Sequence, residues 1–482
     1  MSLFIRKPLE QLLAQAEDSE KSLKRSLSAT NLVALGIGAI IGAGLFSITG
    51  VAAAANAGPA ITISFLVAAL GCAFAGLCYA EFASMIPVAG SAYTYSYATL
   101  GEFIAWIIGW DLVLEYALGA ATVAISWSRY LVKFLEHYDI HIPYYLAMTP
   151  YETATLADGT IVTGTINLPA VIIVIIISLI LIKGIQESAF VNTIIVMLKV
   201  TVVLVFIFLG WGYINPDNYV PYVPENTGTF GEFGFSGVIR AAGIVFFAYI
   251  GFDAVSTAAQ ESKNPKRDMP IGILGSLVVC TILYVLFAHV MTGLANYKEF
   301  AGQDGIAPVA VAISHTPYTF LQQAIILAIL AGYTSVILVM LMGQSRVFFS
   351  MSRDGLLPGF FSDVHSKFKT PYKSNLIFMV FVSLFAGFVP ARVVGEMVSI
   401  GTLLAFVLVC AGVWVMRVKM PNAARTFKTP LVPLVPILGM IICMGMMAFL
   451  PGDTWIRLLI WMAIGIAIYF LYSKKHSFLR RK

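Results

Sequence analysis

Long runs of apolar residues, separated by short polar segments, dominate this chain of 482 residues. The first run, 30–52, contains five glycines and no charged residue. An α-helix rises about 1.5 Å per residue, so about 20 apolar residues cross the hydrocarbon core of a bilayer. The pattern therefore predicts an all-α polytopic membrane protein with twelve transmembrane helices. The predicted spans are 30–52, 59–86, 102–133, 168–184, 189–212, 236–260, 270–294, 320–351, 374–390, 394–416, 431–449 and 454–472.

The composition agrees with this fold class. Hydrophobic residues make up 59% of the chain and charged residues 11%, whereas an average soluble chain is about 25% charged. The sequence shows no metal-ligand cluster, nucleophile–base pair or phosphate-binding loop, so we expect no enzyme, no cofactor and no metal. The cysteines lie inside apolar runs without Cys-x-x-Cys spacing, which favours packing over disulfide or metal roles. They are Cys72, Cys78, Cys280, Cys410 and Cys443.

Basic residues indicate the orientation. The two longest predicted outer loops, 137–167 and 213–235, contain no Lys or Arg, whereas the opposite loops and both tails are basic. Positive charge marks the cytoplasmic side, so we expect both termini there, in a protein of the cytoplasmic membrane. The net charge of +5 lies in these loops and does not indicate a nucleic-acid partner. Residues 1–28 do not resemble a cleavable signal peptide and predict a tail with a short helix on the membrane surface.

Two predicted spans contain residues that weaken a helix. Gly42-Ala43-Gly44 stands at the centre of the first span, and Gly251 with Asp253 interrupts the sixth. A helix break at membrane depth leaves backbone groups unpaired, which is tolerated only inside protein or beside a polar cavity. Each interrupted span leads a group of five, and an odd number of spans inverts the second group relative to the first. We therefore expect an inverted-repeat transporter whose site lies where the two breaks face each other.

Six short segments carry a family resemblance. In the sixth span, residues 246–261 read Phe-Phe-Ala-Tyr-Ile-Gly-Phe-Asp-Ala-Val-Ser-Thr-Ala-Ala-Gln-Glu. The others are Gly-Ile-Gly-Ala-Ile-Ile-Gly-Ala-Gly-Leu-Phe at 36–46, Gly-Ser-Ala-Tyr-Thr-Tyr-Ser-Tyr at 90–97, Gly-Trp-Asp-Leu-Val-Leu-Glu-Tyr at 109–116, Asn-Pro-Lys-Arg-Asp-Met-Pro-Ile-Gly-Ile at 264–273 and Ser-Arg-Asp-Gly-Leu-Leu-Pro at 352–358. Together they resemble the amino acid–polyamine–organocation superfamily, and more narrowly the bacterial branch of its cationic amino acid transporter family.

The resemblance implies a LeuT-type 5+5 inverted-repeat core with discontinuous first and sixth helices, two peripheral helices, and coupled uptake of amino acids. Residues 29–212 would form the first repeat, 213–417 the second, inverted repeat, and 418–473 the peripheral helices. The tails would be residues 1–28 and a basic cytoplasmic segment, 474–482.

The resemblance also implies a carboxylate site at the first break. The amides of Ala43 and Gly44, beside Gly42, would hold the α-carboxylate of an amino acid, because a helix N-terminus attracts anions. The family usually has a threonine where this chain has Ala43, so bare backbone amides would hold the carboxylate here. A second interpretation, close helix packing through Gly38-x-x-x-Gly42, is compatible with the first.

Carbonyl groups near both breaks would bind the substrate ammonium. These belong to Ala39 and Ile40 in the first span and to Ala248 and Ile250 in the sixth. Phe246 resembles the family's aromatic lid, although Phe246 and Phe247 also fit ordinary packing positions. Met340 of the eighth span would line and narrow the space for the substrate side chain.

Lys199 lies in the middle of the fifth span, where a charged amine costs several kcal/mol. Burial disfavours the charged form of an amine, so such a lysine can exchange a proton near neutral pH. The resemblance places Lys199 close to the first break, where sodium-coupled relatives of this fold bind their ion. We therefore expect proton coupling through Lys199. The alternative is a permanently charged lysine that ties the fifth helix to carbonyls of the first.

Other polar residues in the spans have structural interpretations. Asp253 is expected to pin helix ends through hydrogen bonds, with substrate binding as the alternative. Asp111 and Glu115 are four residues apart and share one helix face. For these two and for Glu81 we expect interhelical hydrogen bonds. His289 is expected to be a packed neutral side chain, with proton shuttling as the alternative.

These expectations combine into one function, the proton-coupled import of amino acids by alternating access. The substrate would be small and neutral, with cationic amino acids as a second option, because Asp253 is the one acidic residue near either break. The expected partners are this substrate, protons and the lipid bilayer, and a small membrane subunit stays open. The alternatives are a proton-independent exchanger and a transporter-like amino acid sensor. A channel is disfavoured because the spans show no continuous polar stripe.

Overall fold

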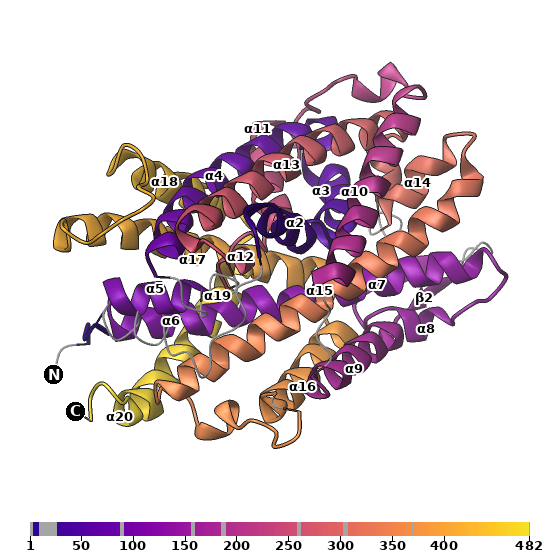
Figure 1. The fold of residues 1–482 in the computed structure, drawn as a ribbon. Helices are drawn as coiled ribbons and strands as arrows, with labels where there is room; N and C mark the ends of the chain where they lie inside the picture. Colours follow the sequence, from indigo (N-terminus) through magenta and orange to yellow (C-terminus); the bar gives the residue numbers. More distant parts are fainter. Residues whose placement is uncertain are drawn as a thin grey trace.

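The computed structural model describes residues 3–8, 27–86, 91–155, 160–184, 189–257, 262–301, 307–368 and 370–481. These residues form a bundle of helices that run in one general direction, and Figure 1 shows both termini at the same end. We call the surface at this end, which includes residues 3–8 and 469–481, the terminal face.

The long helices follow the apolar runs of the sequence. In the first half they are α4 (Ile61–Met85), α6 (Glu102–Val113), α7 (Gly119–Glu136), α9 (Leu168–Ile182) and α10 (Ala189–Trp211), with a π-helical turn, η4 (Leu114–Leu118), between α6 and α7. In the second half they are α13 (Pro265–Leu294), α15 (Thr319–Arg353), α16 (Tyr372–Phe388), α17 (Ala391–Lys419), α18 (Leu434–Phe449) and α19 (Gly452–Ile468).

The first and sixth spans are interrupted, as their sequences predict. The first consists of α2 (Ala29–Ile40), the π-helical turn η1 (Gly44–Ile48), α3 (Thr49–Ala52), the π-helical turn η2 (Ala53–Ala57) and the 3-10 turn η3 (Gly58–Ala60). The sixth consists of α11 (Gly234–Val245), the 3-10 turn η6 (Phe246–Tyr249) and α12 (Ala254–Thr257). The turns η1 and η6 contact each other inside the bundle.

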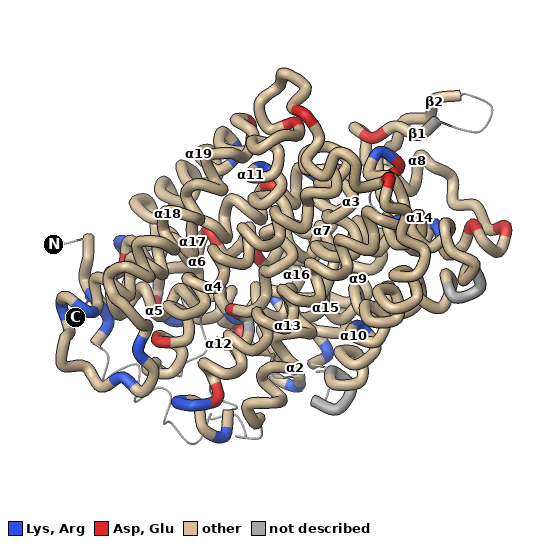
Figure 2. The backbone as a smooth tube through the Cα atoms, turned by 90° about the horizontal axis from the view of Figure 1, so that it is seen from above, with Lys and Arg blue, Asp and Glu red and all other residues tan. Residues whose placement is uncertain are grey.

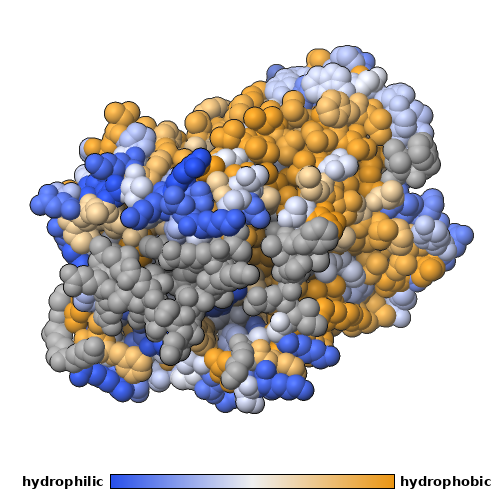
Figure 3. All heavy atoms as spheres, viewed as in Figure 1, coloured by the Kyte–Doolittle hydropathy of each residue, from blue (hydrophilic) through white to orange (hydrophobic). Residues whose placement is uncertain are grey.

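The outer surface of the bundle is apolar. Seven helical stretches of the described residues are long and apolar enough to cross a membrane, and four shorter apolar helices accompany them. On α10, the side chains of Phe208 and Met197 are 75% and 66% exposed. Figure 3 shows a broad hydrophobic area between more hydrophilic ends. Such a large apolar surface requires lipid around it, so this is a multi-pass membrane protein. The count of twelve spans and the inverted repeat remain predictions.

Packing between helices places the interrupted spans at the centre. Helix α13 contacts both α2 and α4, α15 contacts α7, α16 contacts α9, and α17 contacts α18 and α4. Figure 2 shows Lys and Arg gathered around the terminal face, while the backbone between the two ends carries few charged positions. Those helices therefore hold both breaks in a mainly apolar interior, in which Lys199 and Asp253 are among the few charged residues.

Several short elements have no apolar run to predict them. These are α5 (Ser91–Thr99), α8 (Tyr144–Ala147), α14 (Pro308–Ser314), α20 (Lys474–His476), the π-helical turn η11 (Tyr469–Ser473), the 3-10 turns η5 (Pro216–Tyr219), η8 (Tyr297–Phe300) and η10 (Gly359–Ser362), and the strands β1 (Thr153–Thr155) and β2 (Ile161–Thr163). The strands pair antiparallel, with Thr153 opposite Thr163. Helix α5 carries three tyrosines and every one of its residues is buried, so tertiary packing rather than amphipathicity stabilises it.

The expected helix on the membrane surface is wrong for residues 3–8. This segment has no helix; it lies against the start of α6, where the amide of Glu102 donates to the Ile5 carbonyl at 2.8 Å. The amide of Phe103 donates to the Leu3 carbonyl at 3.3 Å. Backbone hydrogen bonds to the bundle therefore replace the expected lipid contacts. The remainder of that predicted helix, 9–26, lies outside the described residues.

Candidate functional site

The first break leaves backbone amides without helical partners. Helix α2 ends at Ile40, and Ile41 is extended, with φ −72° and ψ 106°. The amides of Leu45 and Phe46 both donate to the Gly42 carbonyl at 3.2 Å. Among the described residues, the amides of Gly42, Ala43 and Gly44 donate to no backbone carbonyl. These amides stand at the N-terminal end of a new helical segment, which is a site that favours an anion.

The second break is built from a tight turn and a glycine. The 3-10 turn η6 ends at Tyr249, and Ile250 is extended, with φ −60° and ψ 135°. Gly251 has φ +116°, a conformation that residues with a Cβ atom rarely adopt. The chain then turns through Asp253 into α12. Carbonyl groups of this turn point away from a regular helix and become available to other donors.

Two glycines allow the breaks to touch. A Cβ atom added to Gly44 would lie 2.2 Å from the Cα atom of Ala248. A Cβ atom added to Gly251 would lie 2.8 Å from the carbonyl oxygen of Ala39. Backbone therefore meets backbone between the two interrupted helices, as it does where small residues let membrane helices approach. The residues named for the carboxylate and for the ammonium thus lie in one place.

Tyr284 of α13 joins the two breaks. Its hydroxyl lies 2.9 Å from the carbonyl oxygen of Ile40 and 2.9 Å from that of Ala248. Both carbonyls had been assigned to the substrate ammonium, and each oxygen keeps a second lone pair for it. The sequence reasoning missed Tyr284; the one available signal was a polar hydroxyl in the middle of an apolar span.

Lys199 reaches the first helix just before its break. Its Nζ atom donates to the carbonyl of Gly38 at 2.7 Å, and the side chain is 2% exposed. Gly332 of α15 leaves room for it, because a Cβ atom there would lie 3.0 Å from the Lys199 Cε atom. The amine therefore ties α10 to α2. This contact is common to both interpretations of Lys199, the proton carrier and the fixed cation.

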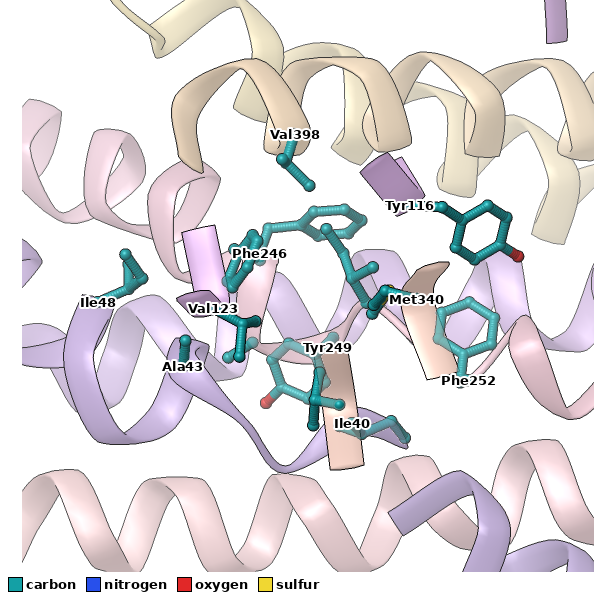
Figure 4. Packing of buried hydrophobic residues seen from close by; sticks show 14 of the residues in the cluster. Ile40, Ala43, Ile48, Tyr116, Val123, Phe246, Tyr249, Phe252, Met340 and Val398 are labelled. Atoms are coloured by element: carbon teal, nitrogen blue, oxygen red, sulfur yellow. The ribbon is translucent and has the colours of Figure 1, made fainter. Parts of the chain in front are cut away.

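Apolar side chains enclose the space beside the breaks. Phe246 is fully buried, and its ring packs edge-on against Phe406 at 5.3 Å between centroids. Met340 is 4% exposed, and a Cβ atom on Gly119 of α7 would lie 3.7 Å from its sulfur. Figure 4 shows Phe246 and Met340 close together, with side chains of α7 and α17 around them. Phe246 and Met340 are therefore buried side chains that pack beside the two breaks. The labelled neighbours are Ile40, Ala43, Ile48, Tyr116, Val123, Tyr249, Phe252 and Val398.

A group of buried acids lies beside the second break. Asp253 accepts hydrogen bonds from the hydroxyls of Tyr116 at 2.6 Å and Ser91 at 3.3 Å, which is the expected pinning of helix ends. The expected interhelical hydrogen bonds of Asp111 and Glu115 are absent from the described residues, because none of their carboxylate oxygens has a partner. Glu115 and Asp253 are thus two acids that lie near each other in the interior.

Three further expectations agree with the structure. Glu81 binds Arg417 through two hydrogen bonds, at 2.8 and 2.9 Å, and so joins α4 to α17. His289 stacks on Tyr219 with ring centroids 4.7 Å apart, as a packed side chain would. The cysteines are free and buried. A shallow depression lies away from the breaks, where α10 meets α13, α14 and α15, and residues such as Phe206, Leu209 and Ile325 line it.

Known proteins resemble this chain over its whole length. The Amino acid permease family matches residues 27–470. The branched-chain amino acid permease BcaP of Bacillus subtilis (strain 168) is 48% identical over 476 residues, 99% of this chain and 98% of the relative. A methylthioribose transporter of the same organism is 45% identical over 480 residues, 100% of both chains. The vacuolar cationic amino acid transporter 4 of Arabidopsis thaliana is 36% identical over 431 residues, 87% of this chain and 68% of the relative.

The fold and the site together define a class of protein: a multi-pass helical membrane protein in which two helix breaks meet in the interior. The chain belongs to the amino acid permease family, within the amino acid–polyamine–organocation superfamily. The resemblance seen in its sequence is thereby confirmed, and the chain is a membrane transport protein.

Proposed function

We propose that this chain imports neutral amino acids across the cytoplasmic membrane by alternating access, coupled to protons. One observation carries the proposal: the first break, with its unpaired amides, packs directly against the second break, where Gly44 meets Ala248. The carboxylate of an amino acid would bind the amides of Ala43 and Gly44. Its ammonium would bind the carbonyls of Ile40 and Ala248, which Tyr284 holds in position. A free amino acid carries both charges on one carbon, and donors and acceptors for both would lie here where the two breaks meet.

The substrate side chain would lie against Phe246, Met340 and Val123. This wall offers no hydrogen bond to a polar or charged group, and burying an unpaired charge is costly. Small neutral residues such as alanine therefore remain candidates. Branched-chain amino acids join them, because BcaP is a relative. Methylthioribose is a second candidate substrate because a 45% identical relative is named for it, and its thioether would suit the same apolar wall.

Lys199 would carry the coupling proton. When charged, it holds the Gly38 carbonyl and stabilises α2 next to the carboxylate site. Loss of its proton removes that charge-assisted hydrogen bond and frees the inner part of the first helix to move. In this proposal the terminal face is the cytoplasmic face, because the basic loops and tails of the sequence lie on that side.

Reconstituted protein tests the proposal directly. Liposomes with an inward proton gradient are given labelled alanine, leucine, arginine, glutamate or methylthioribose, with and without sodium. We expect alanine or leucine to accumulate without sodium and to leave when a protonophore is added. Accumulation that requires sodium would contradict proton coupling. Uptake only against preloaded amino acid would identify an exchanger, and uptake of methylthioribose alone would overturn the amino acid assignment.

A further inference from the structure

We propose that the two ends of the chain form a latch that keeps the cytoplasmic side of the site closed. The inference rests on the proposed function for its orientation, in which the terminal face is cytoplasmic. It concerns contacts that the transport cycle would have to break, and it adds residues remote from the two helix breaks.

Helix α5 is the element that the latch holds. It contacts α12, the inner part of the second interrupted helix, and Ser91 at its start donates to the Asp253 carboxylate. Every residue of α5 is buried. The helix therefore lies between the second break and the terminal face. Opening of the site toward that face requires α12 and α5 to separate.

The N-terminal end of the chain fastens α5 to the end of α15. The Lys7 amide donates to the Tyr97 carbonyl at 3.2 Å. The Lys7 amine binds one carboxylate oxygen of Asp354 at 2.8 Å, and the Tyr93 hydroxyl donates to the other at 2.8 Å. Lys7 is only 7% exposed although it lies at the end of the molecule. One aspartate thus links residues 3–8, α5 and α15.

The C-terminal end fastens the start of α6. Glu102 is fully buried and accepts from the Arg480 Nε atom at 2.6 Å, the Tyr469 hydroxyl at 2.9 Å and the Tyr97 hydroxyl at 3.1 Å. The Ser477 hydroxyl is a fourth donor. A buried carboxylate with four donors is satisfied, and removal of its cation leaves a charge that burial penalises.

Asp354 unites the two halves of the latch. Its side chain binds Lys7, and its backbone carbonyl accepts from the Phe478 amide at 3.1 Å. The next residue, Gly355, has φ +79°, and a Cβ atom there would lie 2.4 Å from the His476 carbonyl oxygen. The C-terminal segment therefore packs so closely against the end of α15 that a side chain at position 355 would collide with it. Both ends of the chain are held where α5, α6 and α15 meet, so the contacts last only while these elements stay together.

The experiment measures access to the site from the cytoplasmic side. A reporter cysteine replaces Ser256 on α12, a fully buried residue, and inside-out membrane vesicles are treated with a membrane-impermeant maleimide. Arg480→Gln and Lys7→Gln are expected to speed labelling at least about 5-fold, the lower range of typical coupling between sites. The neighbouring variants Arg481→Gln and Arg6→Gln are matched controls and should label at the parent rate. Arg480→Lys, which keeps the charge, should fall between.

Equal labelling in all these variants would overturn the latch. Labelling of the native buried cysteines in the same variants without the reporter would also overturn it. That result would show that these contacts stabilise the whole fold and do not control access to the site. Restoration of slow labelling by pairing Lys7→Asp with Asp354→Lys would support the proposal. The labelling measurement needs no transported substrate. Its result can therefore be interpreted even if the proposed substrate or the proton coupling is wrong. Normal proton-driven uptake with unchanged labelling would overturn the latch alone.

Discussion

The break in the first helix and the break in the sixth differ in what replaces the helical hydrogen bonds. At the first, glycines leave amides unpaired, and Lys199 holds a carbonyl of the preceding turn. At the second, aromatic residues form a tight 3-10 turn whose Ala248 carbonyl is held by Tyr284. The first break thus offers unpaired amides together with the Ile40 carbonyl, and the second offers the Ala248 carbonyl beside an apolar wall. Under the proposed function, the carboxylate of an amino acid would bind the amides and its ammonium would bind the two carbonyls.

Replacing the charge at the first break is expected to have the largest effect. Lys199→Met keeps an unbranched side chain of nearly the same length and removes the amine, so accumulation driven by a pH gradient should be abolished. Lys183→Met, at the end of α9, is the control and should accumulate substrate normally. Uptake into liposomes at two external pH values measures both. Full accumulation by Lys199→Met would remove Lys199 from the coupling mechanism.

Separating the two breaks should have the next largest effect. Gly44→Ala places a methyl group 2.2 Å from the Cα atom of Ala248, so the backbones must move apart. Overpacking of this kind costs about 1–3 kcal/mol, and we expect uptake to fall by about 10-fold or more with a lower melting temperature. Gly445→Ala is the matched control, because nothing lies within 4 Å of its added Cβ atom. Wild-type uptake by Gly44→Ala would show that the breaks need not touch.

Removing the hydroxyl that joins the breaks should have a moderate effect. Tyr284→Phe keeps the ring but releases the carbonyls of Ile40 and Ala248. A hydrogen bond contributes about 0.5–1.5 kcal/mol, so the substrate Kd should rise about 3- to 10-fold, as measured by isothermal titration or a thermal shift. Tyr151→Phe, whose side chain is 82% exposed, should bind like the parent. An unchanged Kd in Tyr284→Phe would mean that the ammonium binds elsewhere.

Adding a hydroxyl at the first break should have the smallest effect. Ala43→Thr adds a donor beside the unpaired amides, and we expect substrate to bind about 2- to 5-fold tighter, within the range of one hydrogen bond. Ala43→Val has the same shape without the hydroxyl and should not gain affinity. Equal binding by the two variants would place the carboxylate away from Ala43.

The sequence indicated much of this arrangement because the membrane restricts the possible structures. Backbone groups must pair inside the helix that carries them, so apolar runs marked α4, α10, α13 and α17 to within a few residues. For the same reason, glycines in the first span and Gly251 in the sixth marked both interruptions. Residues without such a constraint were missed: α5 has no apolar run, and residues 3–8 were expected on the lipid surface but bind the start of α6.

Pairwise chemistry was harder to predict. Glu81 was expected to bond another helix, but its partner Arg417 lies 336 residues away and could not be named. Asp111 and Glu115 were expected to form hydrogen bonds to other helices, yet none of their carboxylate oxygens has a partner among the described residues. Tyr284 gave almost no signal, because one hydroxyl in an apolar span has many possible uses.

The sequence by itself determined that this chain is a membrane protein, where its two interrupted helices lie, and to which family it belongs. The spacing of hydrophobic residues and the local backbone preferences depend on residues that are neighbours in the sequence. They can therefore be predicted without knowledge of the tertiary structure. Only the tertiary structure decided that Gly44 meets Ala248, that Tyr284 bonds both breaks, that Lys199 holds Gly38, and that both chain ends meet at Asp354. Those contacts join residues tens to hundreds of positions apart, and packing alone chooses such partners.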